Sequence, residues 1–95
     1  MCGRFSQFSK LEILREYFDI DDIESDLPPR YNIHPENDIA VIVEINGKRI
    51  LRPMKWGLIP FWSKKPRMEY STINARGETL EVRPTFRHSF KTRRC

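Results

Sequence analysis

The sequence predicts an α+β fold in which a mainly antiparallel β core is flanked by short helices. An amphipathic helical pattern lies near the N-terminus, and an apolar, β-branched segment further along is followed by the turn-forming pair Asn46-Gly47. The length of 95 residues suffices for one small domain. With 39% hydrophobic and 32% charged residues, the composition is that of a globular protein and not of a disordered chain.

The helix is predicted over residues 9–19. Ser9 and Glu12 have the spacing of a capping box, in which each side chain bonds the backbone N–H of the other residue. Phe8 and Ile13 occupy the hydrophobic-staple positions around this cap. Apolar residues then recur at spacings of three and four and mark the helix face that we assign to the core: Leu11, Leu14 and Phe18.

A β-hairpin is predicted in the middle of the chain. Residues 38–45 are mostly apolar and β-branched, which is typical of a strand. Asn46 and Gly47 both tolerate a positive φ and form the strongest short hairpin-turn signal in the sequence. Residues 48–54 return as the second strand.

The second half of the chain is predicted to be less regular. We expect residues 56–60 to continue the sheet and to leave it at Pro60, and residues 61–68 to form an exposed loop. Residues 71–75 are predicted to be a short strand, and a helical turn follows Gly77.

The last residues, 90–95, are predicted to begin a further strand. Because no turn, cap or polar tail follows this strand, we expect the chain to be truncated. It would then be the N-terminal portion, residues 1–95, of a single larger domain.

Charge is distributed unevenly along the chain. Residues 1–46 hold four basic and ten acidic side chains, whereas residues 47–95 hold thirteen basic and three acidic side chains. This asymmetry is typical of a surface that meets a polyanion such as a nucleic acid backbone, and a solvated basic face without a partner is the alternative. The sequence has no apolar run long enough for a membrane helix and no signal peptide, so we expect an intracellular protein with no membrane partner.

We expect no metal site and no cofactor. His34 and His88 are isolated from each other and from other ligand residues, so neither has metal-ligand spacing. Cys2 and Cys95 do not form a disulfide framework, which favours a reducing compartment.

Cys2 is the candidate nucleophile. Removal of Met1 would leave Cys2 with an α-amine and a thiol on adjacent carbons, and both groups have nucleophilic forms that are accessible close to neutral pH. The amine can condense with an aldehyde to an imine, and the thiol can then close on the same carbon to form a thiazolidine ring. The alternative is an ordinary cysteine without a function.

Four segments of the chain, in this order, resemble the SRAP family of SOS response-associated peptidases, which process abasic sites in DNA. They are residues 1–5 (MCGRF), 30–35 (RYNIHP), 56–62 (WGLIPFW) and 73–79 (INARGET). The resemblance implies a DNA-damage response protein that loses Met1 by self-processing and captures the aldehyde of an abasic site in single-stranded DNA. The product would be a covalent thiazolidine crosslink between DNA and protein, and β-elimination (lyase) activity is also implied.

The same resemblance assigns roles to single residues. Cys2 matches the nucleophile, and Asn74 matches an asparagine beside it that holds the amine or orients the forming ring. Five further positions match residues that contact DNA: Arg4, Asn32, Pro35, Trp62 and Arg76. The arginine guanidinium suits bidentate contact with phosphate, and tryptophan can stack on a base. Without the resemblance, Asn74 is more simply a turn residue, and each arginine is a solvated charge. Trp56 is expected to pack in the core.

The chain departs from the family in one respect. The family's remaining catalytic groups, a glutamate and a histidine, lie in the segment that would follow Cys95, so full activity of the 95-residue chain is not expected. Two alternatives therefore stand beside the crosslinking enzyme. One is a non-covalent module that binds modified or single-stranded DNA, and the other is an inactive fragment that self-associates through an exposed sheet edge.

Overall fold

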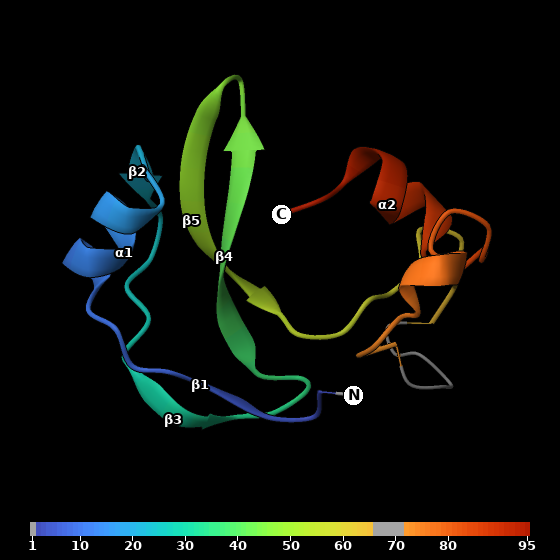
Figure 1. Cartoon of the computed structure of the whole chain (residues 1–95), viewed down its shortest axis with the longest axis horizontal. Helices are drawn as coiled ribbons and strands as arrows, with labels where there is room; N and C mark the ends of the chain where they lie inside the picture. The colour runs from blue at the N-terminus through green and yellow to red at the C-terminus, as the bar shows by residue number, and fades with distance from the viewer. Residues whose placement is uncertain (1, 66–71) are drawn as a thin grey trace. The chain divides into compact units, whose positions relative to one another are not determined.

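The computed structural model describes residues 2–65 and 72–95 and confirms the α+β class (Figure 1). The elements of these residues, in chain order, are β1 (Phe5–Gln7), α1 (Leu11–Tyr17), β2 (Asp22–Ile23), β3 (Arg30–Ile33), β4 (Asp38–Ile45), β5 (Lys48–Lys55), the 3-10 helix η1 (Gly77–Thr79) and α2 (Arg87–Thr92). The chain divides into two compact units. The N-terminal unit is Gly3–Trp56 with Cys95, and the C-terminal unit is Gly57–Arg94 with Cys2.

The predicted hairpin is confirmed as β4 and β5. Asn46 and Gly47 adopt φ values of 53° and 77°, the left-handed conformation that a tight two-residue turn requires. The antiparallel register runs without interruption from Asp38 opposite Lys55 to Ile45 opposite Lys48. β2 lies parallel along the other edge of β5, which gives the strand order β2-β5-β4 (Figure 1).

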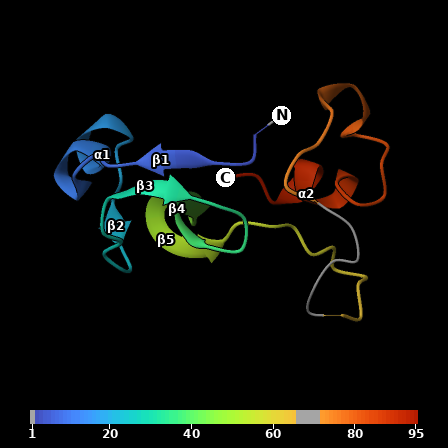
Figure 2. The ribbon, with the colours of Figure 1, turned by 90° about the horizontal axis from the view of Figure 1, so that it is seen from below.

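A second, two-stranded sheet belongs to the same unit. β1 and β3 pair antiparallel, with Phe5 opposite Ile33, and they lie side by side in Figure 2. This pairing holds β1, near the first residues of the N-terminal unit, on β3.

The hydrophobic core is small. Among the described residues, the buried hydrophobic side chains are Ile20, Ile33 and Leu51. Large apolar side chains are exposed beside them, and the ring of Phe18 is one of these at 40% exposure. The assignment of Phe18 to the core is therefore wrong, while Leu11 and Leu14 of the same helix face are half-buried.

The predicted capping box at Ser9 is also wrong. α1 begins at Leu11 with Lys10 as its N-cap and has no side-chain cap hydrogen bond. Instead, the side chain of Gln7 forms hydrogen bonds with both the N–H and the carbonyl oxygen of Ser9. Its Nε2 donates to the Ser9 carbonyl oxygen and its Oε1 accepts from the Ser9 N–H, each at 3.4 Å. The shifted start moves Phe8 and Ile13 off the staple positions, and the Phe8 ring stacks on Tyr31 with a centroid distance of 5.4 Å.

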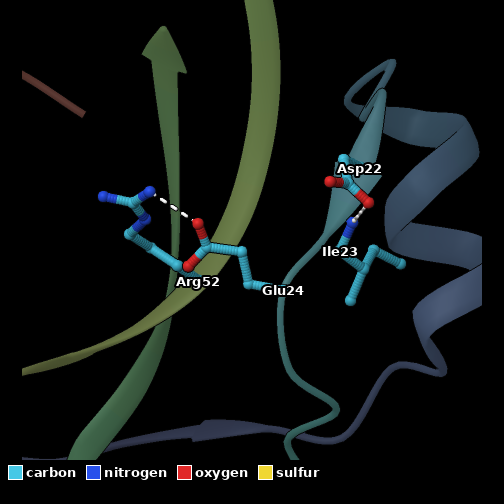
Figure 3. A network of polar contacts seen from close by, with 4 residues as sticks. All are labelled: Asp22, Ile23, Glu24 and Arg52. Carbon is cyan, nitrogen blue, oxygen red and sulfur yellow. Dashed lines mark hydrogen bonds and ion pairs between the residues drawn. The ribbon is translucent and has the colours of Figure 1, made fainter.

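One ion pair ties the β2 segment to β5. Arg52 Nη2 donates to Glu24 Oε1 at 2.6 Å, and nearby the Asp22 carboxylate accepts from the Ile23 N–H at 2.9 Å (Figure 3). Both charged groups of the pair are partly exposed, so its contribution to stability is small.

The continuation of the sheet to Pro60 is not observed. β5 ends at Lys55, and Gly57, with a φ of 147°, turns the chain out of the sheet. Residues 61–65 form the expected loop, whereas 66–68 lie outside the described residues. The strand predicted over 71–75 is absent from its described part, 72–75, while the helical turn after Gly77 is confirmed as η1.

The strand predicted over residues 90–95 is wrong, because the chain forms α2 there. Phe90 N–H donates to the Phe86 carbonyl at 2.9 Å, and Arg93 N–H donates to the Ser89 carbonyl at 2.9 Å. The Thr92 hydroxyl adds a bond to the His88 carbonyl at 3.0 Å. These bonds are all local, so the segment satisfies its backbone without a neighbouring strand. In the described part of the chain, no helix is long and apolar enough to cross a membrane.

Candidate active site around Cys2

The side chain of Asn74 holds the backbone of Cys2 on both sides. The Cys2 N–H donates to Asn74 Oδ1 at 3.1 Å, and Asn74 Nδ2 donates to the Cys2 carbonyl oxygen at 2.8 Å. The two residues are 72 positions apart and belong to the same compact unit. A carboxamide that accepts from N–H and donates to C=O fixes the orientation of the residue that it pairs with. Cys2 itself is exposed, and its sulfur is a thiol.

A buried threonine, Thr72, lies two residues before Asn74 and fixes the backbone there to Leu58. The Thr72 hydroxyl donates to the Leu58 carbonyl oxygen at 2.8 Å and accepts from the Leu58 N–H at 3.1 Å. Thr72 is 9% exposed, so these bonds lie away from bulk water. They join Leu58 to Thr72, two residues before Asn74. Thr72 cannot be found from the sequence, because a single threonine with a distant backbone partner leaves no local pattern.

Two more of the predicted site residues lie in the C-terminal unit. Arg76 is exposed and forms the N-cap of η1, and its carbonyl accepts from the Thr79 N–H at 3.2 Å. Trp62 is 49% exposed in the loop that follows Pro60. Residues 57–94 hold nine basic and three acidic side chains, so this unit is strongly cationic.

The other three predicted residues lie in the N-terminal unit. Arg4 is exposed and directly precedes β1, and Asn32 is exposed on β3. Phe5 of β1 lies opposite Ile33 of β3, so Arg4 and Asn32 are each one residue away from this pair in sequence. Pro35 is half-buried just after β3.

Trp56 is half-buried and does not belong to the buried core that the sequence predicts for it, but its contacts are structural. Its N–H donates to the Asn37 carbonyl at 2.9 Å, and its carbonyl accepts from the Glu36 N–H at 2.9 Å. Phe5 packs edge-on against its ring with a centroid distance of 5.3 Å. Asn37 also accepts the His34 N–H through Oδ1 at 3.1 Å. These contacts join Phe5, the turn from His34 to Asn37, and Trp56 in one small cluster of the N-terminal unit. No pattern in the sequence singles out Asn37.

The histidines have local partners. His34 Nδ1 lies 2.9 Å from the Pro35 carbonyl oxygen, and since a carbonyl only accepts, Nδ1 carries the proton. The His88 ring packs on Phe61 with a centroid distance of 4.7 Å. Within residues 2–65 and 72–95, no group of three or more His, Cys, Asp or Glu side chains is arranged to hold a metal ion.

Several known proteins are similar to this chain along most or all of its length. The protein named abasic site processing protein YoqW, from Bacillus subtilis, is 40% identical over 97 residues, which cover all of this chain and 43% of YoqW. Abasic site processing protein YedK of Escherichia coli is 35% identical and covers 92% of this chain and 40% of its own length. The chain thus spans less than half the length of these relatives.

A solved structure shares the fold. The crystal structure of a Bordetella bronchiseptica protein superposes with a TM-score of 0.73 at 25% sequence identity, over 94% of this chain and 43% of the other. A family model described as SOS response associated peptidase (SRAP) matches residues 1–95, from one end of the sequence to the other. The chain therefore belongs to the SRAP family of SOS response-associated peptidases.

Proposed function

We propose that this chain carries the nucleophilic part of an abasic site processing protein, in which Cys2 forms a covalent thiazolidine crosslink with abasic DNA after loss of Met1. The observation that carries the proposal is the double hydrogen bond between Asn74 and the backbone of Cys2. The names of the relatives YoqW and YedK support the class of substrate.

The proposed reaction joins Cys2 to the ring-opened aldehyde of the abasic sugar. The α-amine attacks the aldehyde carbon, and loss of water gives an imine. The thiol sulfur then adds to the imine carbon, and the nitrogen takes up the proton that the thiol releases. This closes the five-membered ring. No oxidant or reductant is needed.

Asn74 suits the first step of this reaction. Once Met1 is removed, the nitrogen that now donates to Asn74 Oδ1 becomes the attacking amine. An oxygen that accepts one amine N–H orients the nitrogen lone pair without adding a charge that would favour the protonated form. Nδ2 meanwhile holds the Cys2 carbonyl, so the residue cannot rotate freely.

The DNA partner is proposed to be single-stranded. Trp62 is exposed beside Lys64 and Lys65, and interleaved aromatic and basic residues are typical of surfaces that stack bases and neutralise phosphates. Arg76, two residues from Asn74, and Arg4, two residues from Cys2, are the proposed phosphate contacts. Asn32 and Pro35 complete the proposed DNA-contacting set.

The proposal extends to the whole protein in four respects. Loss of Met1 is the proposed self-processing (peptidase) step, and β-elimination at the abasic site is a proposed lyase activity. Residues 1–95 are proposed to be the N-terminal portion of one SRAP domain. The protein is proposed to act inside the cell, where its DNA substrate is.

A crosslinking assay tests the proposal. The chain is incubated with a single-stranded oligonucleotide that contains one abasic site, heated, and run on a denaturing gel, both alone and with the part of YoqW that has no counterpart in this chain. We expect a shifted band for the wild type and for Cys95→Ala, and none for Cys2→Ala. Cys95→Ala is the matched control, because it removes the chain's other exposed thiol.

Two further substrates sharpen the result. An abasic site reduced to the alcohol has no aldehyde and should give no band, while the same lesion in a duplex tests the preference for single strands. Intact mass shows whether Met1 is gone. The proposal is wrong if Cys2→Ala gives the wild-type band, or if the wild type gives none under either condition. Salt-sensitive binding without a covalent band would favour the non-covalent module instead.

A further inference from the structure

β4 is an edge strand with the sequence of a central one. In the sheet β2-β5-β4, the hairpin pairs one edge of β4 with β5, and among the described residues no strand pairs with its other edge. Residues 39–43 are an unbroken apolar run, Ile-Ala-Val-Ile-Val, which is typical of strands covered on both faces. All five of these residues are nevertheless partly exposed.

The outer edge of β4 also lacks the features that keep sheet edges from pairing. Its register with β5 runs through eight residue pairs without a bulge. The strand contains no proline and no lysine, and its charged residues, Asp38 and Glu44, lie at or near its ends. A long, regular, apolar edge of this kind is a template for an added strand.

A mostly apolar pocket adjoins the first residues of β4. Its volume is about 340 Å³, and it lies within the N-terminal unit. Its apolar wall includes Leu11 and Leu14 of α1, Ile33 of β3, and Ile39 and Ala40 of β4, and polar side chains also line it: Gln7, Arg30 and Asp38. A strand laid along β4 would therefore find a recess for an apolar side chain beside Ala40.

We propose that the outer edge of β4 pairs with a strand from the part of an SRAP polypeptide that has no counterpart in these 95 residues. The relatives identify this occupant. This chain covers only 43% of YoqW, and the Bordetella structure keeps the same fold over 94% of this chain inside a polypeptide more than twice as long. Within residues 2–65 and 72–95 the buried hydrophobic core is three residues beside many exposed ones, which is what a domain shows when part of its packing is supplied by other polypeptide.

The ladder predicts which backbone groups make this contact. In a two-residue hairpin the two residues next to the turn, here Ile45 and Lys48, form a hydrogen-bonded pair. Along the strand, residues whose N–H and C=O groups bond the partner strand then alternate with residues whose N–H and C=O groups point to the outer edge. Val41 and Val43 accordingly face β5 with their N–H groups, whereas Ala40, Ile42 and Glu44 direct theirs to the outer edge.

Hydrogen exchange measured by NMR tests this placement. The probe is the unmatched part of YoqW, made as a separate polypeptide and added to the 95-residue chain. In the chain alone we expect fast exchange at Ala40, Ile42 and Glu44 and slow exchange at Val41 and Val43. In the complex the three outer amides should exchange at least about tenfold more slowly. The proposal is overturned if no complex forms, or if these amides stay fast in a saturated complex.

A variant pair gives a second measurement. Ala40→Pro removes one outer N–H, leaves the bonds to β5 intact, and should weaken binding of the YoqW part by on the order of tenfold. Ala40→Val has a side chain of similar volume, keeps the N–H and should bind within about twofold of the wild type. Equal affinities of the two variants would contradict strand pairing, and retained protection at Val43 checks that each hairpin is folded. A dimer of the chain alone, with the outer amides already protected, would assign the edge to a second copy and overturn the proposal.

Discussion

Replacing Asn74 separates the orientation of Cys2 from its chemistry. Asn74→Ala removes both the acceptor for the Cys2 N–H and the donor to the Cys2 carbonyl, and it leaves the thiol untouched. We expect the crosslink to form more slowly, because the amine is no longer held in one orientation. Asn74→Asp is the more informative variant, since it keeps the acceptor and loses the donor.

The size of the effect follows from the exposure of the two bonds. A hydrogen bond contributes about 0.5–1.5 kcal/mol net, and these two lie at an exposed residue, so together they contribute about 1–2 kcal/mol. This free energy corresponds to a crosslinking rate about 5- to 30-fold lower for Asn74→Ala. In Asn74→Asp the new carboxylate stabilises the protonated amine, which is not nucleophilic. Its rate deficit should therefore be largest near neutral pH and shrink as the pH rises.

The assay is a single-turnover time course with excess protein over an oligonucleotide that carries one abasic site, quenched and resolved on a denaturing gel. Binding of an intact oligonucleotide of the same sequence is measured in parallel and should stay within about twofold of the wild type, because Asn74 is assigned to Cys2 and not to phosphate. The reasoning is refuted if Asn74→Ala crosslinks at the wild-type rate, or if the deficit of Asn74→Asp is the same at every pH.

Three further predictions concern stability, measured by denaturant unfolding. Thr72→Val should lower the free energy of unfolding by about 1–3 kcal/mol, because it leaves the backbone N–H and C=O of Leu58 without their partner, whereas Thr72→Ser keeps the hydroxyl and should lose less. An equal loss in both variants would show that removing the hydroxyl costs no more than removing the methyl group, which would contradict this assignment. Gly47→Ala should cost about 1–2 kcal/mol, because φ at this residue is 77°. Gly77→Ala is its control, because an added Cβ would meet nothing within 4 Å at either glycine, whereas of the two only Gly47 has a positive φ. Similar losses of unfolding free energy in both variants would contradict the argument from backbone conformation. Glu24→Gln should cost only about 0.2–1 kcal/mol, because its pair with Arg52 is partly exposed, and the difference from wild type should narrow in high salt. A larger, salt-independent loss would mean that Glu24 contributes something other than this ion pair.

The parts of the fold that the sequence predicts are those fixed by neighbouring residues. Asn46 and Gly47 determine their turn through their own φ preferences, so the hairpin follows from this pair and the eight residues on either side of it. The predicted start of α1 is wrong for a similarly local reason. Both Ser9 and Lys10 are compatible with the cap, and the side chain of Gln7, which the capping-box pattern does not include, occupies the backbone of Ser9.

The prediction of a strand over residues 90–95 is wrong because a strand needs hydrogen bonds to a neighbouring strand, whereas a helix forms its hydrogen bonds within its own segment. Phe90 and Thr92 are found in strands as well as in helices, so their identity does not decide between the two. In the structure Phe90 bonds the carbonyl of Phe86 and Thr92 bonds the carbonyl of His88, and both carbonyls precede residue 90, where the predicted strand begins. The pairing of Cys2 with Asn74 was expected from the family resemblance alone. Thr72 and Leu58, which support it, are 14 positions apart and are joined only by the tertiary structure.

Cys2, the proposed nucleophile, and the core of the N-terminal unit depend on different polypeptide segments. Asn74 holds Cys2, and Thr72 joins Leu58, through hydrogen bonds that lie within these 95 residues. In contrast, the exposed apolar run of β4 and the small core, which among the described residues is Ile20, Ile33 and Leu51, call for further packing. Added polypeptide that pairs with β4 should therefore raise the stability of the N-terminal unit while leaving the Cys2–Asn74 bonds as they are. If the two proposals hold, Asn74→Ala should slow crosslinking by the same factor with and without that polypeptide, whereas Ala40→Pro should affect only the stability gained from it.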